Sequence, residues 1–341
     1  MKIGILTGGG DCPGLNPAIR GCVYRGLDFG YECLGFLEGW KGISDGNYIP
    51  LGLTEVENII DRGGTILGTS RYNPFKKEGG TEKVEETIRR VGIGALVAMG
   101  GEDTLGVANK LHQRGCKVVG VPKTMDNDLS ATDYTFGFDT AVTRAIEACR
   151  ALSDTGQSHR RIMILEVMGR HAGWVALFTA LGSGADWVLL PEFKPDLSAM
   201  LRHLKGIYQR KKFALVIISE GTDFTEGAEK SAGEKDSFGH VILKKRGVGE
   251  QIANYIEKET GIETRVSVIG HMQRGGAPTL FDRILGLRAG AKAAELVSEG
   301  KFGMMAALKG QEVVGVPLAE AVAHLKIVDQ KWYDLAGVFF K

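Results

Sequence analysis

Short apolar runs bounded by glycine and proline recur along this chain of 341 residues. The runs at 93–99 and 116–121 have the length and composition of buried parallel strands. Between them Leu105, Ala108 and Leu111 recur at helical spacing, so one face of the intervening segment is apolar. This pattern predicts a strand–helix–strand unit, and the crossover in such a unit is right-handed.

The same alternation continues on both sides of this unit. One helix is expected to open at a capping box formed by Thr54 and Glu57, and another to be capped by Asp139. The pattern predicts an α/β fold with mostly parallel sheets, ending in a short strand and an amphipathic helix after Gly310. The other expected strands are 2–7, 32–36, 162–167, 187–190, 213–219 and 265–269, and the other expected helices are 17–27, 84–91, 250–260 and 279–298.

Length and composition narrow the function classes. At roughly 150 residues per domain, 341 residues suggest two lobes. The formal net charge of +1 gives no reason to expect nucleic acid or an anionic membrane as the main partner. No apolar run approaches the length of a membrane span. The five cysteines are odd in number and have no metal or redox spacing, so we expect a cytoplasmic protein with reduced thiols.

Charged residues gather where the two strands of the first unit end. The segment 100–103 carries Glu102 and Asp103, and the segment 122–128 carries Lys123, Asp126 and Asp128. Ligands of such units lie beyond the carboxyl ends of the strands, so we expect these groups to face one crevice. Carboxylates and a lysine beside glycine-rich turns suit a magnesium–phosphate site and phosphoryl transfer. Ordinary polar turns are the alternative for either segment alone.

A glycine turn at 8–16 follows the first strand. Such a turn, placed before a helix, offers backbone N–H groups to an anion. A dinucleotide site with Glu38 at the ribose is an alternative, but Pro13 stands where the third glycine of that pattern belongs. The chain contains no P-loop pattern. Further along, Arg71 follows a glycine-rich stretch, and His271 and Arg274 share one glycine-rich loop that suits a second anionic group.

These segments together resemble the 6-phosphofructokinases along nearly the whole chain. The matching blocks, in order, are GGGDCPGLN, RGGTILGTSR, GGEDT, PKTMDND, HRRI, EVMGRHAG, SEG and GHMQRGG. The resemblance implies two three-layer α/β lobes with an active-site cleft between them. It divides the chain into a donor-binding lobe, 1–138 with about 250–305, and a fructose 6-phosphate lobe, 139–249 with about 306–341. A polar segment at 223–249 is longer than in compact bacterial members.

The resemblance also implies the roles of individual residues. Asp126 matches the general base, and Glu102 matches a carboxylate linked to magnesium, the expected cofactor; Asp128 lies near the metal side. The expected catalytic residues are Asp126, Lys123, Asp103 and Arg170, and the expected donor-binding residues are Gly10, Arg71, Asp103 and Lys123. The expected fructose 6-phosphate residues are Thr124, Met125, Asp126, Arg161, Met168, Gly169, Arg170, Glu220, Arg265, His271, Met272, Gln273 and Arg274.

The donor is expected to be pyrophosphate, because ATP-dependent members usually carry glycine where this chain has Asp103. A carboxylate there would repel the α-phosphate of ATP, and Lys123 would help to orient pyrophosphate. An ATP-dependent 6-phosphofructokinase is the alternative. A further alternative is a sugar-phosphate sensor without catalytic activity. The presence of Asp126 argues against this alternative.

The resemblance implies a homo-oligomer, usually a tetramer. Arg161 and Arg265 match arginines that reach the 6-phosphate bound by a neighbouring subunit, so each active site is expected to span an interface. Tyr24, Leu53 and Ser153 fall where allosteric members carry effector-site arginines. This departure argues against regulation at that site.

Overall fold

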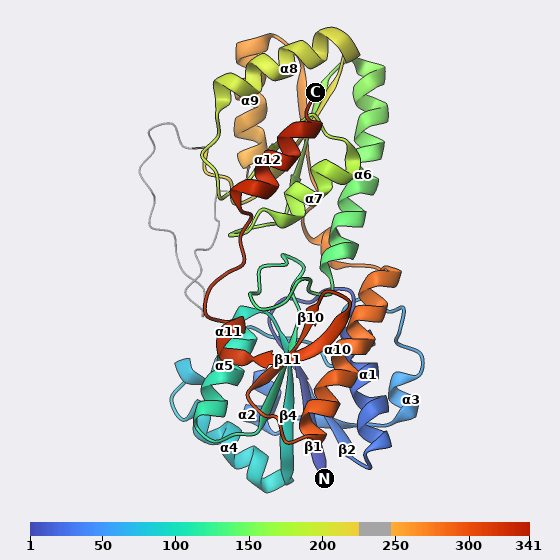
Figure 1. The fold of residues 1–341 in the computed structure, drawn as a ribbon, viewed down its shortest axis with the longest axis vertical. Helices are drawn as coiled ribbons and strands as arrows, with labels where there is room; N and C mark the ends of the chain where they lie inside the picture. The colour runs from blue at the N-terminus through green and yellow to red at the C-terminus, as the bar shows by residue number, and fades with distance from the viewer. Residues whose placement is uncertain (225–246) are drawn as a thin grey trace.

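The computed structural model describes residues 1–224 and 247–341. Its elements form two lobes, one above the other along the long axis of the molecule (Figure 1). In the described residues the strands form a seven-stranded sheet in the lower lobe and a four-stranded sheet in the upper lobe. We call these the large lobe and the small lobe. The predicted α/β class with mostly parallel sheets is confirmed.

The large sheet has the strand order β11-β10-β5-β4-β1-β2-β3. Its interior strands pair in parallel, whereas β3 and β11 pair antiparallel at the two edges. Thr7 pairs with Met99 and Gly100 pairs with Pro122, so the carboxyl ends of β1, β4 and β5 lie at one edge. The strands are β1 (Lys2–Thr7), β2 (Glu32–Phe36), β3 (Tyr48–Leu51), β4 (Ile93–Gly100), β5 (Val118–Pro122), β10 (Met304–Lys309) and β11 (Glu312–Pro317).

Helices cover both faces of this sheet, which is why its central strands are apolar along their length. On β4, Val97 packs into the core beneath α1 and α10, whereas the next residue, Ala98, packs into the core beneath α2, α4 and α5. The helices of this lobe are α1 (Leu15–Asp28), α2 (Trp40–Asp45), α3 (Leu53–Val56), η1 (Pro74–Lys76), α4 (Gly80–Val91), α5 (Glu102–Gln113), α10 (Leu280–Ser298) and α11 (Leu318–Ala321).

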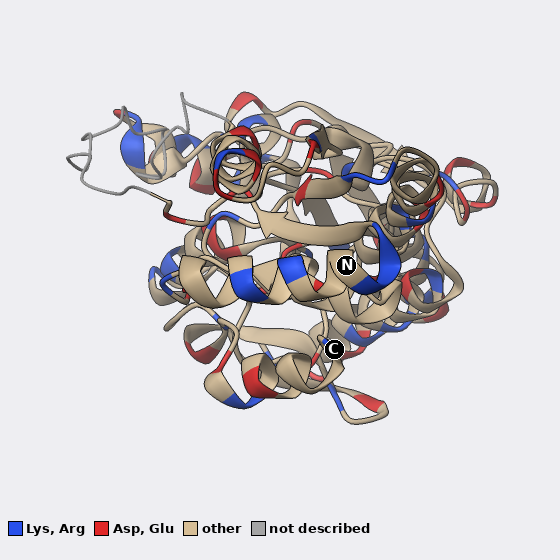
Figure 2. Ribbon diagram, turned by 90° about the horizontal axis from the view of Figure 1, so that it is seen from above, with Lys and Arg blue, Asp and Glu red and all other residues tan. Residues whose placement is uncertain are grey.

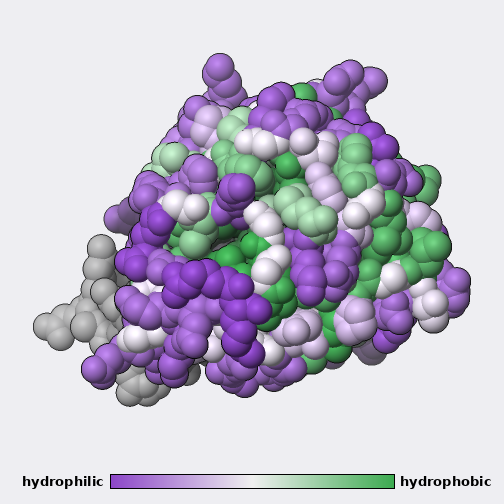
Figure 3. Space-filling model, turned by 90° about the horizontal axis from the view of Figure 1, so that it is seen from below, coloured by the Kyte–Doolittle hydropathy of each residue, from purple (hydrophilic) through white to green (hydrophobic). Residues whose placement is uncertain are grey.

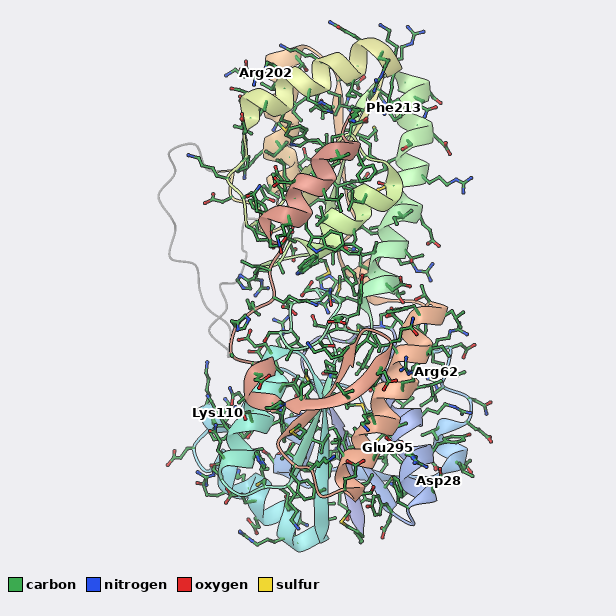
Figure 4. All side chains as sticks on the ribbon, in the orientation of Figure 1. Asp28, Arg62, Lys110, Arg202, Phe213 and Glu295 are labelled. Atoms are coloured by element: carbon green, nitrogen blue, oxygen red, sulfur yellow. The ribbon has the colours of Figure 1, made fainter. Side chains whose placement is uncertain are left out.

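The helices α1 and α10 lie against each other unusually closely. A Cβ at Gly290 would stand 2.0 Å from the carbonyl oxygen of Ala18, so only glycine permits this approach. At the far end Arg25 pairs with Glu295 of α10 at 3.2 Å and with Asp28 at 3.4 Å (Figure 4). The close contact fixes α10, and with it the loop that precedes it, on the large lobe.

The small sheet has the order β7-β8-β6-β9, and all its pairs are parallel. Apolar residues of β6 alternate between two cores: Ile164 faces α8 and α9, and Leu165 faces α6 and α7. The elements of this lobe are α6 (Phe138–His159), β6 (Ile162–Val167), α7 (Trp174–Ser183), β7 (Trp187–Leu189), α8 (Leu197–Lys211), β8 (Ala214–Ser219), α9 (Val248–Thr260), β9 (Thr264–Val268), η2 (Gly270–Arg274) and α12 (Gln330–Phe339).

Within the described residues the chain passes between the lobes three times: from β5 to α6, from β9 to α10, and from α11 to α12 (Figure 1). The predicted division is therefore wrong for two segments. β9 pairs with β6 and so belongs to the small lobe, whereas β10 pairs with β5 and so belongs to the large lobe. The pairing partner of a strand depends on contacts distant in sequence, which the local apolar pattern does not contain.

Each predicted strand is present, but two predicted helix caps are wrong. The helix α3 begins after Gly52, whose N–H donates to Glu55 at 2.7 Å, and not at Thr54. Asp139 lies inside the first turn of α6 and accepts a hydrogen bond from Thr279 at 2.6 Å, so a tertiary contact uses this carboxylate. Most of the polar segment predicted at 223–249 lies outside the described residues.

The surface carries both charge signs. In the view from above, Lys and Arg alternate with Asp and Glu over the helices (Figure 2), as the net charge of +1 leads one to expect. Seen from below, hydrophobic side chains gather in the middle of the end of the large lobe, between hydrophilic ones (Figure 3). Within residues 1–224 and 247–341, no helix combines the length and apolar character that crossing a membrane requires.

Candidate active site

A cavity of about 290 Å³ opens between the two lobes at the carboxyl ends of β1, β4 and β5. Where the ribbons of the two lobes separate in Figure 4, side chains from both lobes project into the space between them. The large lobe contributes Gly9, Gly10, Arg71, Gly101, Glu102, Asp103, Thr104, Lys123, Thr124, Asp126 and Asp128 to the lining. The small lobe and the crossings contribute Met168, Arg170, His171, Glu220, His271, Arg274 and Leu325.

The glycine turn after β1 is held from several sides. The N–H of Gly9 donates to Ser70 at 3.3 Å, and the carbonyl of Gly9 accepts from Thr69 at 2.6 Å. Arg274 reaches across from the small lobe and donates to the carbonyl of Asp11 at 3.0 Å. A Cβ at Gly10 would lie 2.6 Å from this guanidinium, so a larger residue here would displace the Arg274 side chain.

The carboxylates of Glu102 and Asp103 lie in the first turn of α5, directly after β4. Gly101 is the N-cap residue of this helix, with extended backbone. Negative charge at a helix N-terminus is stabilised by the backbone N–H groups and the helix dipole. The N-terminus of α5 therefore stabilises both carboxylates, which lie at the edge of the cavity.

Lys123 and Asp126 follow β5 at the neighbouring strand end. Lys123 is only 3% exposed, and its ammonium donates to the carbonyl oxygen of Gly10. Burial lowers the pKa of Lys123, and the positive charge of Arg274 also contributes. The N–H of Asp126 donates to the hydroxyl of Thr124 at 3.1 Å, which turns the chain toward the cavity.

Asp128 lies beside Asp126 in the same cavity. Burial, and then the neighbouring carboxylate of Asp126, raise the pKa of Asp128 to about 7. A neighbouring negative charge disfavours the charged form of a carboxyl group. The protonated form of Asp128 is therefore more favoured than that of an aspartate exposed to water.

The small lobe places a second loop opposite these carboxylates. The hydroxyl of Ser219 donates to the carbonyl of Gly169 at 2.6 Å, and the N–H of Met168 donates to the side chain of Gln273 at 2.8 Å. These contacts fix the backbone that presents Arg170. The cavity thus combines carboxylates from the large lobe with cations from both lobes, which is the charge pattern of a phosphoryl-transfer site.

Comparison with known proteins agrees with this chemistry. A family model described as phosphofructokinase matches residues 2–297. A pyrophosphate–fructose 6-phosphate 1-phosphotransferase of Amycolatopsis methanolica is 51% identical over 342 residues, covering 100% of both chains. The chain belongs to the phosphofructokinase family.

Both donor classes occur among the relatives of this phosphofructokinase. ATP-dependent 6-phosphofructokinase 2 of Streptomyces coelicolor is 46% identical over 343 residues, covering 100% of both chains. The crystal structure of a pyrophosphate-dependent phosphofructokinase from Nitrosospira multiformis has the same fold, with a TM-score of 0.84 and 21% identity over 96% of this chain and 86% of the other. Membership of the family alone therefore does not identify the phosphoryl donor.

Not every predicted site residue of this phosphofructokinase lines the cavity. Met125 is buried in the core, and Gln273 is buried with its amide donating to the carbonyl of Ala141 at 3.2 Å. Met272 is 75% exposed on the outer surface. Gly169 is part of the 168–171 loop but does not line the cavity, and its carbonyl accepts the hydrogen bond from Ser219.

Arg161 and Arg265 lie together outside the cavity. Both pair with Glu263, Arg161 at 2.7 Å. The side chain of Arg161 is 28% exposed and that of Arg265 is 52% exposed. The structure therefore does not bring either arginine to the cavity of its own chain.

The structure also adds residues that the sequence analysis did not select. His171 lies in the EVMGRHAG block and could have been found there. Leu325 comes from the crossing between α11 and α12, where no charged or glycine-rich motif marks a site. Its position in the cavity follows only from the path of this crossing in the structure.

Proposed function

We propose that this phosphofructokinase transfers a phosphoryl group from pyrophosphate to the 1-hydroxyl of fructose 6-phosphate. The products are fructose 1,6-bisphosphate and phosphate, and the reaction is reversible, serving glycolysis or gluconeogenesis. The observation that carries the choice of donor is the placement of Asp103 in the same cavity as Lys123 and the glycine turn. Full-length identity of 51% to a pyrophosphate-dependent relative supports it.

Asp103 adds a negative charge where the polyphosphate chain of ATP would continue. Like charges repel more strongly in a partly desolvated cleft than in bulk water. Pyrophosphate is shorter and ends before it reaches Asp103, so this carboxylate does not repel it in the same way. Lys123 and Arg71 line the same part of the cavity and supply the positive charge that a short, highly charged donor needs.

Asp126 accepts the proton of the attacking 1-hydroxyl. It follows β5, its N–H is bound to the hydroxyl of Thr124, and it lines the same cavity as the glycine turn and Arg170. Arg170 approaches from the small lobe and offsets charge that develops on the transferred group. Positioning and charge stabilisation account for most of the acceleration in reactions of this kind.

The sugar phosphate occupies the side of the cavity formed by the small lobe. Glu220 accepts a hydrogen bond from a sugar hydroxyl, and His271 and Arg274 bind the 6-phosphate. Arg274 also donates to Asp11 on the donor turn, so sugar binding and the donor loop are linked through one side chain.

Magnesium fits this cavity as a cofactor shared with the donor. In the described residues no three His, Cys, Asp or Glu side chains form a ready metal cage. Magnesium does not need one, since it keeps several waters and binds through one or two carboxylates and substrate phosphates. Glu102 would hold it, and the ion would neutralise charge on the phosphate oxygens.

The active site is shared between subunits of a homo-oligomer, most simply a tetramer. Support comes from Arg161 and Arg265, which lie outside the cavity of their own chain and partly exposed. An apolar groove on the small lobe, lined in part by Leu152, Val268 and Met272, offers a surface for a second copy. The five free cysteines fit a cytoplasmic location.

A coupled assay with each donor in turn tests the proposal. The purified protein is expected to form fructose 1,6-bisphosphate with pyrophosphate and magnesium, and to run in reverse with phosphate. Omission of magnesium should abolish both directions. Efficient turnover with ATP and none with pyrophosphate would assign the protein to the ATP-dependent class instead.

A further inference from the structure

The crossing from α11 to α12 passes beside the cavity. This segment, residues 322–329, rises from the large lobe to the small lobe in Figure 1. Leu325 lines the cavity and forms an isolated β-bridge with Leu129, one residue beyond Asp128. The crossing therefore contacts the loop that carries both cavity aspartates of β5.

Lys326 donates hydrogen bonds to this loop from both its side chain and its backbone. Its ammonium donates to the side-chain oxygen of Asn127 at 3.0 Å, to the carbonyl of Thr132 at 3.0 Å and to the carbonyl of Asp133 at 2.8 Å. Its backbone N–H donates to the carbonyl of Asp128 at 2.7 Å. Burial lowers the pKa of Lys326 to about 8, as expected for an amine withdrawn from water to make these contacts.

The contact with Asn127 bears directly on the position of Asp126. Asn127 is 3% exposed and has a φ of 52°, a left-handed conformation that asparagine tolerates better than most other non-glycine residues. Its side-chain oxygen accepts from Lys326 and from the N–H of Thr135 at 3.1 Å. These two hydrogen bonds fix the residue next to the carboxylate that receives the proton.

The other end of the crossing is fixed to the small lobe. The carbonyl of Lys326 accepts from the indole N–H of Trp174 at 2.8 Å. The N–H groups of Val328 and Gly173 donate to the same oxygen of Glu192, at 2.9 Å and 2.8 Å. Gly173 and Trp174 directly follow the loop that presents Arg170, so the crossing connects the loops of both lobes.

We propose that Lys326 is a positioning residue for phosphoryl transfer, which holds the Asp126 loop against the sugar-binding loop through Asn127 and Trp174. It touches neither substrate and acts through the groups that do. The inference rests on the proposed role of Asp126 as the base. Misplacement of a reacting group by about 1 Å can cost about 100-fold in rate, so the loss of such a support is measurable.

The first test replaces Lys326 with methionine, which keeps the unbranched stem and removes the three side-chain donors. We expect kcat to fall about 10- to 100-fold, while KM for pyrophosphate stays within about threefold, because no contact of Lys326 reaches the donor turn. The matched control is Lys331→Met, an exposed lysine at the start of α12. A Lys326→Met enzyme that is folded and has wild-type kcat would overturn the proposal.

A double variant separates positioning of Asp126 from a general effect on the fold. In the Asp126→Asn background, Lys326→Met should cost less than about threefold in kcat, because the base it positions is already gone. If Lys326→Met lowered kcat in the Asp126→Asn background as much as it does in the wild-type enzyme, the link to Asp126 would be overturned. Near-normal kcat in Asp126→Asn alone would instead refute the proposed base, a distinct failure that also removes the basis for the link.

A milder variant covers the case in which Lys326→Met does not fold. Trp174→Phe keeps an aromatic ring next to Phe178 and removes the indole N–H that binds the carbonyl of Lys326, together with part of the ring. A lower kcat with unchanged KM for pyrophosphate supports the proposal. Unchanged kcat in a folded Trp174→Phe enzyme contradicts it.

Discussion

The ammonium of Lys123 donates a hydrogen bond to the carbonyl oxygen of Gly10. Lys123 follows β5 and Gly10 follows β1, and β4 lies between these two strands in the sheet. The lysine therefore reaches across the end of β4 to hold the glycine turn that follows β1. Its side chain is buried and lines the cavity, so it combines this support with a positive charge there.

Lys123→Met should remove both the support and the charge while keeping the stem of the side chain. We expect kcat with pyrophosphate to fall by about 100-fold, the usual cost of losing one stabilising donor in a transition state. Steady-state kinetics at fixed magnesium check this. Lys110→Met is the control, an exposed lysine on α5 that is labelled in Figure 4. Equal kcat values for the Lys123→Met and Lys110→Met enzymes would show that Lys123 is not part of the active site.

Asp126→Asn keeps the shape of the general base but cannot accept the proton. We expect kcat to fall by roughly 10²–10⁴ with little change in fructose 6-phosphate affinity. Single-turnover kinetics and calorimetric titration of the sugar phosphate measure the two quantities separately. Asp154→Asn, at an exposed position of α6, serves as the control. Turnover near the wild-type value would exclude Asp126 as the base.

Subunit mixing tests the shared active site. Arg161 pairs with Glu263 outside its own cavity, so Arg161→Ala should weaken sugar-phosphate binding by a neighbouring subunit. Mixing Arg161→Ala subunits with Asp126→Asn subunits should restore part of the activity, since one site in such a hybrid is intact. Native mass spectrometry shows whether hybrids form. Hybrids without recovered activity would contradict a site that spans the interface.

Asp282 provides a stability prediction. This carboxyl is fully buried and accepts from the N–H of Thr140 at 2.8 Å, and burial raises its pKa to about 6. The native state then binds the proton more tightly than the unfolded state. The stabilisation is complete at low pH, below the unfolded pKa of aspartate, and is lost as pH rises through about 6.

Asp282→Asn should remove this pH dependence, because an amide does not titrate. By linkage, the free energy of unfolding of the wild type should fall relative to the variant by up to about 3 kcal/mol between pH 4 and pH 7. Urea unfolding of both proteins at one protein concentration measures the difference. Parallel pH profiles would show that Asp282 does not change its protonation state in this range.

The sequence predicted the parts of the site that depend on local pattern. Glu102 and Asp126 follow neighbouring parallel strands, and strands of that kind end at one edge. It did not predict contacts between distant segments. Arg274 reaches Asp11, 263 residues away, and Lys326 reaches Asn127, 199 residues away. Both contacts depend on how the crossings join the lobes, and the membership of β9 and β10 could not be predicted for the same reason.

The donor is the central claim, and Asp103→Gly tests it most directly. The measurement is kcat/KM for pyrophosphate and for ATP, in wild type and variant, at fixed magnesium. We predict that wild type prefers pyrophosphate, and that Asp103→Gly gains measurable ATP use and loses some pyrophosphate turnover while Lys123 stays in place, because the repulsion of the longer polyphosphate is relieved. Wild-type preference for ATP, or a variant with both values unchanged, would contradict the account.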